Sequence, residues 1–358
     1  MKKIRVGIIG ANVNRGWGPR AHLPALLALP DFELTAVCTS RPETALESKE
    51  QFGAQFAFHD YHEMVNHPEI DIVSVVVRVP FHHDMTIAAL NAGKHVFTEW
   101  PLGANLLEAE AMADLARSKG VHTLVGMQRR CSPLYLYLRE LIQGGYIGEV
   151  VSCHLSQMGT GGLTRTSDRT WMGDVNNGAN TMTISFGHAI DALSMCVGEI
   201  INVSAVVGTQ VTRWFESDTN RYVEVNSPDN ILVNGKLANG AVVSAHVASQ
   251  PTHGSGQRIE IYGLDGALFV DGNETRLLGG KTGDTYMEEL PIPERLTCVP
   301  DNVPEGPPFN VAQMYQLFGE AIRSGNRVEP NFDTAVVRHK LLDAIQRSSD
   351  EGTNIRIE

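Results

Sequence analysis

The sequence is poor in cysteine, lacks long apolar runs and has no excess of positive charge. Its five cysteines are odd in number and scattered without a C-x-x-C pair, which argues against a disulfide framework or a zinc site. We expect a reducing, cytoplasmic setting and no metal centre. No apolar stretch approaches the roughly 20 residues of a membrane helix, and the first residues look like a β-strand rather than a signal peptide. We expect a soluble protein.

Negative charge predominates along the chain. Asp and Glu number 41 against 29 Lys and Arg, for a formal net charge of -12. Such a chain repels phosphate backbones and anionic lipid, so we expect neither nucleic acid nor membrane as a partner. At 358 residues with 42% hydrophobic content, the chain is longer than one core usually grows, which favours two domains.

Residues 1–125 alternate short β-branched runs with helical segments. This pattern is typical of the α/β class with a doubly wound parallel sheet covered by helices on both faces, a nucleotide-binding architecture. We predict strands at 4–9, 32–38, 55–58, 72–79, 95–99 and 121–127. We predict helices at 18–29, 41–52, 81–93 and 105–120.

Residues 126–358 have a different rhythm. After a helix at 132–145, several predicted strands are joined by Asn-Gly or Asp-Gly pairs, the strongest short hairpin signal. We predict a second α/β domain built on a largely antiparallel open sheet. Helices at 310–325 and 332–349 have the apolar spacing of segments that pack back on the body, and the C-terminal one is a candidate to pack on the first domain. The proline-rich segment 291–310 is predicted to be a surface loop or an oligomer arm.

The first strand leads into "GIIGANVNRGWGPRAH", where a dinucleotide fingerprint would read G-x-G-x-x-G. Gly10 matches the first glycine, Asn12 stands at the second, and glycines reappear only at Gly16 and Gly18. Asparagine tolerates left-handed backbone, so a tight turn that aims a helix N-terminus at a pyrophosphate is one interpretation. An ordinary strand-to-helix turn is the other, and the motif alone does not separate them.

The second strand ends at Ser40 and Arg41, where an acid commonly binds the ribose hydroxyls. An arginine beside a hydroxyl suits a ribose 2′-phosphate, which favours NADP over NAD. The alternative is a solvated residue in the first turn of a helix.

Three strings together resemble the glucose-fructose oxidoreductase, inositol dehydrogenase and rhizopine-catabolism (Gfo/Idh/MocA) family. They are "ALNAGKHVFTEWPL", "VGMQRRCSPLYLYLRELIQGGYIGEV" and "FGHAIDAL". The resemblance implies a Rossmann domain followed by an α/β domain whose open sheet often mediates oligomerisation. It also implies NAD(P)-dependent oxidation or reduction of a sugar, sugar acid or cyclitol carbinol, by a homodimer or homotetramer.

Two departures from the family pattern concern chemistry. Glu99 and Pro101 match, but the family's catalytic lysine falls on Trp100. His188 and Asp191 match as well, whereas the aspartate expected one turn earlier falls on Ile184. An indole donates only, so it cannot replace lysine in proton transfer.

With these two departures, the sequence resembles a subgroup typified by the galactose-regulon repressor. That repressor binds a dinucleotide and also binds an activator protein. The alternatives to an oxidoreductase are therefore a dinucleotide-binding regulator without chemistry and a redox-neutral, NAD-dependent glycosidase. The regulator lacks support in a basic patch, disordered arm or extra domain.

His188 is the preferred acid-base residue, because Ser185, His188 and Asp191 share one helix face. Asp191 is a candidate catalytic residue that would orient the imidazole or bind a hydroxyl. Trp100, at the end of a strand, is interpreted as a stacking wall of a sugar pocket. The other candidate substrate residues are Arg129, Arg165, Trp171 and Asp174, with Arg169 and Asn176 in the same loop. The candidate cofactor residues are Gly10, Asn12, Ser40, Arg41, His82, Glu99, Pro101 and Gln128. Core packing, interface ion pairs and ordinary surface loops are the alternatives for these residues.

Overall fold

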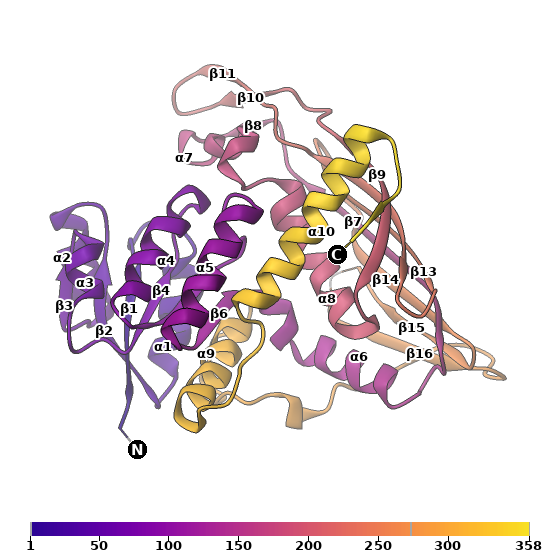
Figure 1. The fold of residues 1–358 in the computed structure, drawn as a ribbon, viewed down its shortest axis with the longest axis horizontal. Helices are drawn as coiled ribbons and strands as arrows, with labels where there is room; N and C mark the ends of the chain where they lie inside the picture. Colours follow the sequence, from indigo (N-terminus) through magenta and orange to yellow (C-terminus); the bar gives the residue numbers. More distant parts are fainter. Residues whose placement is uncertain (1, 273, 358) are drawn as a thin grey trace. The chain divides into compact units, whose positions relative to one another are not determined.

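The computed structural model describes residues 2–272 and 274–357, and the chain divides into two compact units (Figure 1). The first unit consists of Met1–Cys131 and Thr297–Val337, and the second of Ser132–Leu296 and Arg338–Glu358. The sequence predicts a single boundary between 125 and 126. The chain instead crosses between the units after Cys131, Leu296 and Val337, because the penultimate helix returns to the first unit.

The first unit is built on a parallel sheet with the strand order β3-β2-β1-β4-β5-β6. Its strands are β1 (Ile4–Ile9), β2 (Phe32–Cys38), β3 (Phe56–Phe58), β4 (Ile72–Val75), β5 (His95–Glu99) and β6 (Thr123–Gly126). Its helices are η1 (Gly18–His22), α1 (Leu23–Ala28), α2 (Pro42–Phe52), α3 (Tyr61–Val65), η2 (Val79–Phe81), α4 (His82–Asn91), α5 (Leu106–Lys119), η3 (Gln128–Cys131) and α9 (Pro307–Ser324). This order confirms the predicted doubly wound architecture.

Local signals in the sequence account for several of these elements. Helix α5 begins where the Asn105 side chain accepts from the Glu108 amide and ends at Gly120, whose φ is 64°. The helix predicted over 18–29 forms as a π-helical turn, η1, followed by α1. Helix α9 packs on α1 and η1, so a segment remote in sequence completes the core of this unit through Tyr315 and Phe318.

The second unit carries a mixed sheet whose described strands run in the order β17-β16-β15-β14-β7-β13-β12-β9-β18. They are β7 (Val150–Thr160), β9 (Ile200–Gly208), β12 (Asn230–Leu237), β13 (Val242–Gln250), β14 (Gly256–Gly263), β15 (Gly266–Val270), β16 (Leu277–Lys281), β17 (Glu288–Glu289) and β18 (Ile355–Arg356). Neighbours are antiparallel except β7 and β13. The pairs Asn239-Gly240 and Asp265-Gly266 join hairpins, as predicted. The largely antiparallel sheet of the prediction is confirmed.

A smaller sheet, β11-β10-β8, lies at one end of this unit and was not predicted. It consists of β8 (Thr164–Arg165), β10 (Arg213–Glu216) and β11 (Arg221–Glu224). The helices of the unit are α6 (Pro133–Gln143), α7 (Ser167–Thr170), η4 (Trp171–Gly173), η5 (Val175–Asn177), η6 (Thr181–Phe186), α8 (Gly187–Val197), η7 (Glu294–Leu296) and the larger part of α10 (Phe332–Glu351).

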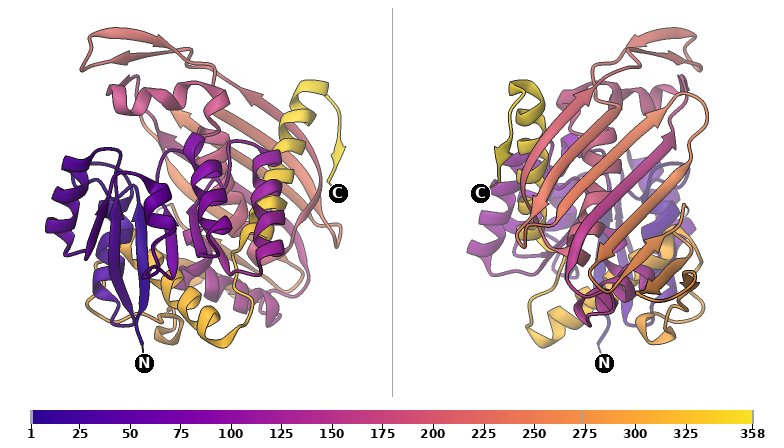
Figure 2. Two further views of the ribbon diagram at one scale, coloured as in Figure 1. Left: turned by 60° about the vertical axis from the view of Figure 1, so that its left-hand side comes forward. Right: turned by 90° about the vertical axis from the view of Figure 1, so that its right-hand side faces the viewer.

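One face of the large sheet is open. The right-hand view of Figure 2 shows its strands in front of the helices that cover the other face. Alternate side chains on the open face stay accessible, including the apolar Val206, Leu232 and Val242. Across the described residues, no helix combines the length and apolarity needed to span a membrane.

The turn after β1 requires a glycine at position 10. Gly10 has a φ of 98°, and a Cβ there would lie 2.0 Å from the Val76 carbonyl oxygen. We expect Gly10→Ala to lower the free energy of unfolding by about 3 kcal/mol, because left-handed strain adds to a backbone clash. Gly53→Ala is the control, since Gly53 has a φ of 70° with open space around its Cβ position. Its cost should be about 1 kcal/mol. Thermal unfolding followed by circular dichroism measures both, and equal losses would contradict the close approach at Gly10.

Candidate functional site

The phosphate loop of the first unit lies at the carboxyl edge of the sheet, where β1 and β4 are neighbours and the strand order reverses. Ligands of doubly wound sheets bind at this switch point. Gly18 takes the packing role of the third fingerprint glycine, because a Cβ there would lie 2.6 Å from the Gly10 carbonyl oxygen. Gly16 has a φ of 97° and open space at its Cβ position. The loop is longer than the standard fingerprint, and Gly10 and Gly18 allow its two ends to approach each other closely.

Sequence reasoning missed the role of Gly18, since the insertion moves it beyond the expected spacing. Asn12 turns into the loop, where its Oδ1 accepts from the Asn14 amide at 3.0 Å. Ser40 and Arg41 are exposed where β2 leads into α2. Among the described residues the Arg41 guanidinium has no hydrogen-bond partner, so it is available to a ligand.

Glu99 is the centre of a buried hydrogen-bond network. Its Oε1 lies 2.7 Å from Nε2 of His22, and its Oε2 accepts from Nε2 of Gln128 at 2.8 Å. The carboxylate packs directly on Gly126, whose Cβ position is 2.6 Å from Oε2. Glu99 and Gln128 therefore bind each other at the ends of β5 and β6.

The network continues away from the carboxylate. His22 Nδ1 lies 2.8 Å from the Tyr315 hydroxyl, which in turn lies 2.8 Å from the Ser74 hydroxyl. A carboxylate only accepts, so His22 donates through Nε2, and in the neutral imidazole its Nδ1 then accepts from the Tyr315 hydroxyl. Burial raises the pKa of the Tyr315 phenol, which keeps that donor protonated. The network joins β4, β5, η1 and α9.

The turn after Glu99 is held from a second side by His82. This buried histidine has Nδ1 2.8 Å from the Pro101 carbonyl oxygen and Nε2 3.1 Å from the Val77 carbonyl oxygen. Burial lowers the pKa of His82. Trp100 lies in this turn and is 5% exposed. The indole at the family's lysine position is therefore fixed by the backbone on both sides of it.

Arginines follow Gln128 in η3. Arg129 is half-buried, and Arg130 lies 3.9 Å from the Glu329 carboxylate. The structure thus gathers Gly10, Asn12, Glu99, Trp100, Pro101, Gln128 and Arg129 on segments that follow the carboxyl ends of the parallel strands.

The second unit carries His188, the predicted acid-base residue. Asn180 caps η6 by accepting from the Met182 and Thr183 amides at 3.0 and 3.1 Å, and η6 runs directly into α8. His188 is half-buried in the first turn of α8. Ile184, at the position of the family's aspartate, lies one turn before it.

Asp191 is buried in an ion pair. Its Oδ1 lies 3.2 Å from Nε of Arg338, which also donates to Ser194 at 3.3 Å and to Glu199 at 3.0 Å. Arg338 is 0% exposed and Asp191 is 1% exposed. The pair joins α8 to α10, so this geometry supports a role for Asp191 in positioning the helix that bears His188.

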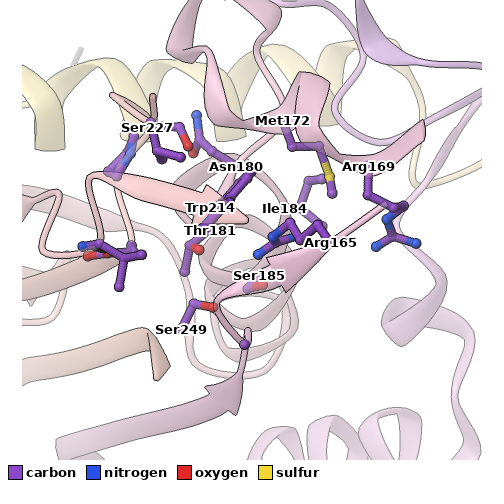
Figure 3. Close-up of a pocket in the computed structure, with 15 residues that line it drawn as sticks. Arg165, Arg169, Met172, Asn180, Thr181, Ile184, Ser185, Trp214, Ser227 and Ser249 are labelled. Carbon is purple, nitrogen blue, oxygen red and sulfur yellow. Dashed lines mark hydrogen bonds between the residues drawn. The ribbon is translucent and has the colours of Figure 1, made fainter. Parts of the chain in front are cut away.

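A pocket lies within the second unit, with a volume of about 200 Å³ (Figure 3). Helix η6, the loop before it and the small sheet contribute its walls. Arg165 lies over the ring of Trp214, 3.7 Å from its centroid. The lining residues are Gly162, Arg165, Arg169, Met172, Asn180, Thr181, Ile184, Ser185, Val211, Trp214, Val225, Ser227, Pro228, Asp229 and Ser249.

The predicted substrate loop is only partly in this pocket. Arg165 and Arg169 line it, whereas Trp171, Asp174 and Asn176 do not. Asp174 is exposed and caps η5 by accepting from the Asn176 amide at 3.0 Å. Trp214, Asp229 and Ser249 were missed because no motif marks them and the fold alone brings them to the loop. Within the part of the chain that is described, no group of three or more His, Cys, Asp or Glu could hold a metal ion.

Comparison with known proteins matches two successive parts of the chain to two family models. Residues 4–127 match the "Oxidoreductase family, NAD-binding Rossmann fold", and residues 133–272 match the "Gal80p, C-terminal domain". The chain joins a Gfo/Idh/MocA N-terminal domain to a Gal80-like C-terminal domain. This confirms the resemblance inferred from the sequence.

Individual relatives include both enzymes and regulators. The dehydrogenase aclE of Aspergillus oryzae is 28% identical, covering 98% of this chain and 97% of its own. The galactose/lactose metabolism regulatory protein GAL80 of Saccharomyces cerevisiae is also 28% identical, over 75% of this chain and 67% of its own. The structure of a levoglucosan dehydrogenase in complex with NADH and L-sorbose has a TM-score of 0.88 at 24% identity, covering 100% of both chains. The likeness to the levoglucosan dehydrogenase structure establishes the fold of this chain.

The buried ion pair gives a test of Asp191. Asp191→Ala would leave Arg338 buried without its full set of partners, so we expect the free energy of unfolding to fall by about 3 kcal/mol. Urea unfolding measures this loss. The exposed Asp174→Ala is the control and should cost less than about 1 kcal/mol, the worth of a cap. Unchanged stability of Asp191→Ala together with lost turnover would instead show a direct chemical role.

Proposed function

We propose that the protein is an NAD(P)-dependent oxidoreductase acting on a carbinol of a sugar, sugar acid or cyclitol. The observation that carries this proposal is the pocket of the second unit, which offers hydroxyl, amide and guanidinium groups one helical turn before His188. Such a lining suits a polyhydroxylated molecule, whose hydroxyls need partners when they leave water. The dehydrogenases among the relatives support the same reaction class.

A nicotinamide dinucleotide, when bound, supplies or accepts the hydride. The phosphate loop at Gly10 and Asn12 would hold its pyrophosphate, and Ser40 with Arg41 would bind a ribose 2′-phosphate. Glu99, Pro101 and Gln128 would form the cofactor edge of the sheet, with His82 as a positioning residue behind it. We therefore favour NADP, and we place the reaction in the cytoplasm.

The chain's own acid-base chemistry falls to His188. Oxidation of a carbinol releases a proton from its hydroxyl, and an imidazole near neutral pH can take it and return it in the reverse reaction. Trp100 cannot accept a proton, so we assign it the role of a wall against which the sugar stacks. Arg129 would bind a substrate hydroxyl or carboxylate.

The open face of the large sheet supports association of two or four copies. Its accessible Val206, Leu232 and Val242 form the apolar part of a surface that a second sheet would cover.

A regulator without chemistry is the second candidate. It is favoured by Trp100 and Ile184 at the positions of the family's lysine and aspartate, and by the Gal80-like match over residues 133–272. Efficient turnover of any sugar by the purified protein would exclude it. Net consumption of cofactor would argue against a redox-neutral glycosidase.

His188→Ala tests the oxidoreductase directly. We expect turnover of a sugar panel, followed by the absorbance of reduced nicotinamide, to fall by at least about 100-fold because the proton acceptor is gone. Cofactor affinity should change by less than twofold. His62→Ala, an exposed histidine of α3, is the matched control and should keep full activity. Turnover by His188→Ala at the native rate would overturn the assignment.

Cofactor choice has its own test in Arg41→Ala. We expect the affinity for NADPH to fall about 10-fold, because a charge-assisted contact to phosphate is lost, while NADH binding stays unchanged. Fluorescence titration of the reduced cofactors measures both. Lys49→Ala, in the last turn of the same helix and away from its N-terminus, is the control cation. Equal effects on NADPH and NADH would remove the argument for NADP.

A further inference from the structure

Arg165 has a constrained environment in the pocket of the second unit. It lies on β8, which pairs in parallel with β10 so that Arg165 faces Glu216 in register while its guanidinium sits over Trp214. Trp214 is 7% exposed and packs beneath Gly173, where a Cβ would approach the indole to 3.2 Å. The Trp214 indole is therefore held in place by packing. The Arg165 guanidinium stacked on it loses little conformational entropy when it binds a ligand.

Among the described residues, no acidic side chain compensates the positive charge of Arg165. Its Nε is buried without a hydrogen-bond partner, and no carboxylate among the described residues lies within ion-pair distance of Arg165 or of the neighbouring Arg169. Burial, and then the like charge of Arg169, lowers the pKa of Arg165. A buried donor without a partner and a half-buried cation both cost free energy until a ligand binds them.

The one carboxylate that lines the pocket is already occupied. Asp229 accepts from the Gln210 amide at 2.9 and 3.0 Å, from the Val211 amide at 2.7 Å and from the Asn230 side chain at 2.9 Å. Its charge is thus offset locally by three donor groups. The pocket presents cationic groups toward a ligand.

The remaining polar lining is neutral. Asn180 uses its Oδ1 to cap η6, which leaves its Nδ2 as a donor. Ser185, Ser227 and Ser249 add hydroxyls that can both donate and accept. The volume of about 200 Å³ is below the range of about 300–1,000 Å³ for drug-sized ligands. The pocket therefore suits a monosaccharide-sized molecule with several hydroxyls.

We propose that this pocket selects an anionic sugar derivative, a sugar acid whose carboxylate binds Arg165 over the Trp214 indole. Arg169 adds positive charge at the rim, and the serine hydroxyls with the Asn180 amide bind the sugar hydroxyls. This narrows the substrate class of the proposed oxidoreductase and rests on it for the chemistry at the carbinol. The binding step itself can be measured without turnover.

Isothermal titration calorimetry of the full-length protein, with and without NADPH, tests the proposal. The probes are glucuronate, galacturonate, gluconate and galactonate, with glucose, galactose and the matching hexitols as neutral counterparts and glucose 6-phosphate as a different anion. We expect at least one sugar acid to bind at least 10-fold more tightly than its neutral counterpart. Arg165→Ala should weaken that binding by about 10- to 100-fold and should weaken the binding of neutral sugars much less. Arg165→Lys should recover only part of it, because lysine lacks the planar fork.

Arg213→Ala is the matched control. Arg213 lies on β10 next to Trp214, is exposed, and pairs with Glu224 at 2.8 Å outside the pocket lining. Its removal takes the same charge from the same small sheet and should leave sugar-acid affinity unchanged. An equal loss in both variants would show a general electrostatic effect and overturn the assignment to Arg165.

The outcomes separate this inference from the proposed function. Arg165-dependent binding of a sugar acid without any reduction of NADP or NAD would support the pocket and refute the oxidoreductase. Turnover of neutral sugars at equal efficiency by the wild type and Arg165→Ala would refute the pocket and support the oxidoreductase. Tight binding of glucose 6-phosphate alone would overturn the carboxylate in favour of a phosphate ester. No anion preference at all would overturn the inference.

Discussion

The need to satisfy buried charge organises both units. At the end of β5 the Glu99 carboxylate leaves water, a change that costs several kcal/mol unless hydrogen bonds replace hydration. His22 and Gln128 supply those bonds, and the donors behind His22 extend through Tyr315 to Ser74. Because Tyr315 comes from α9, a helix remote in sequence completes the network around Glu99.

In the second unit, the buried charge is that of Arg338, which pairs with Asp191. Arg338 is fully buried and is satisfied by Asp191, Ser194 and Glu199, which fixes α8 against α10. A network of this kind is strongly disfavoured when incomplete, so it specifies one arrangement of the two helices. The packing of α8 against α10 therefore sets the position of His188. Arg165 differs from both cases, since its guanidinium is stacked but has no anionic partner among the described residues. A charge left without a partner in a pocket is a natural place for a ligand.

The two departures from the family pattern also acquire a physical meaning. Trp100 lies in a turn held by Glu99 on one side and by Pro101 and His82 on the other. Ile184 lines the pocket where the family has an aspartate. With Ile184 apolar and two arginines in the lining, the acidic residue among the described lining residues is Asp229, whose charge is offset by local donors. Loss of the lysine and loss of the aspartate are therefore consistent with a shift in ligand charge as well as with a loss of chemistry.

Hydrophobic pattern alone determined most of the architecture. The strands at 4–9, 32–38 and 95–99 form with the predicted bounds, since buried parallel strands are short β-branched runs that need no distant partner to be recognised. Helix α5 begins at its cap Asn105 and ends at Gly120, as predicted. The Asn-Gly and Asp-Gly hairpins also form. These features depend on neighbours within a few residues. The sequence also predicted site roles for Glu99, Trp100 and His188, and these roles stay predictions.

Only the tertiary structure decided which groups meet. Glu99 lies 77 residues from His22, and Asp191 lies 147 residues from Arg338, so no local pattern predicts either pair. The same holds for Arg165 and Trp214, which the small sheet brings together. The long-range pairs form because buried polar groups must find partners in the folded chain. Which partner each group finds is a property of the packed elements rather than of the segments that carry them.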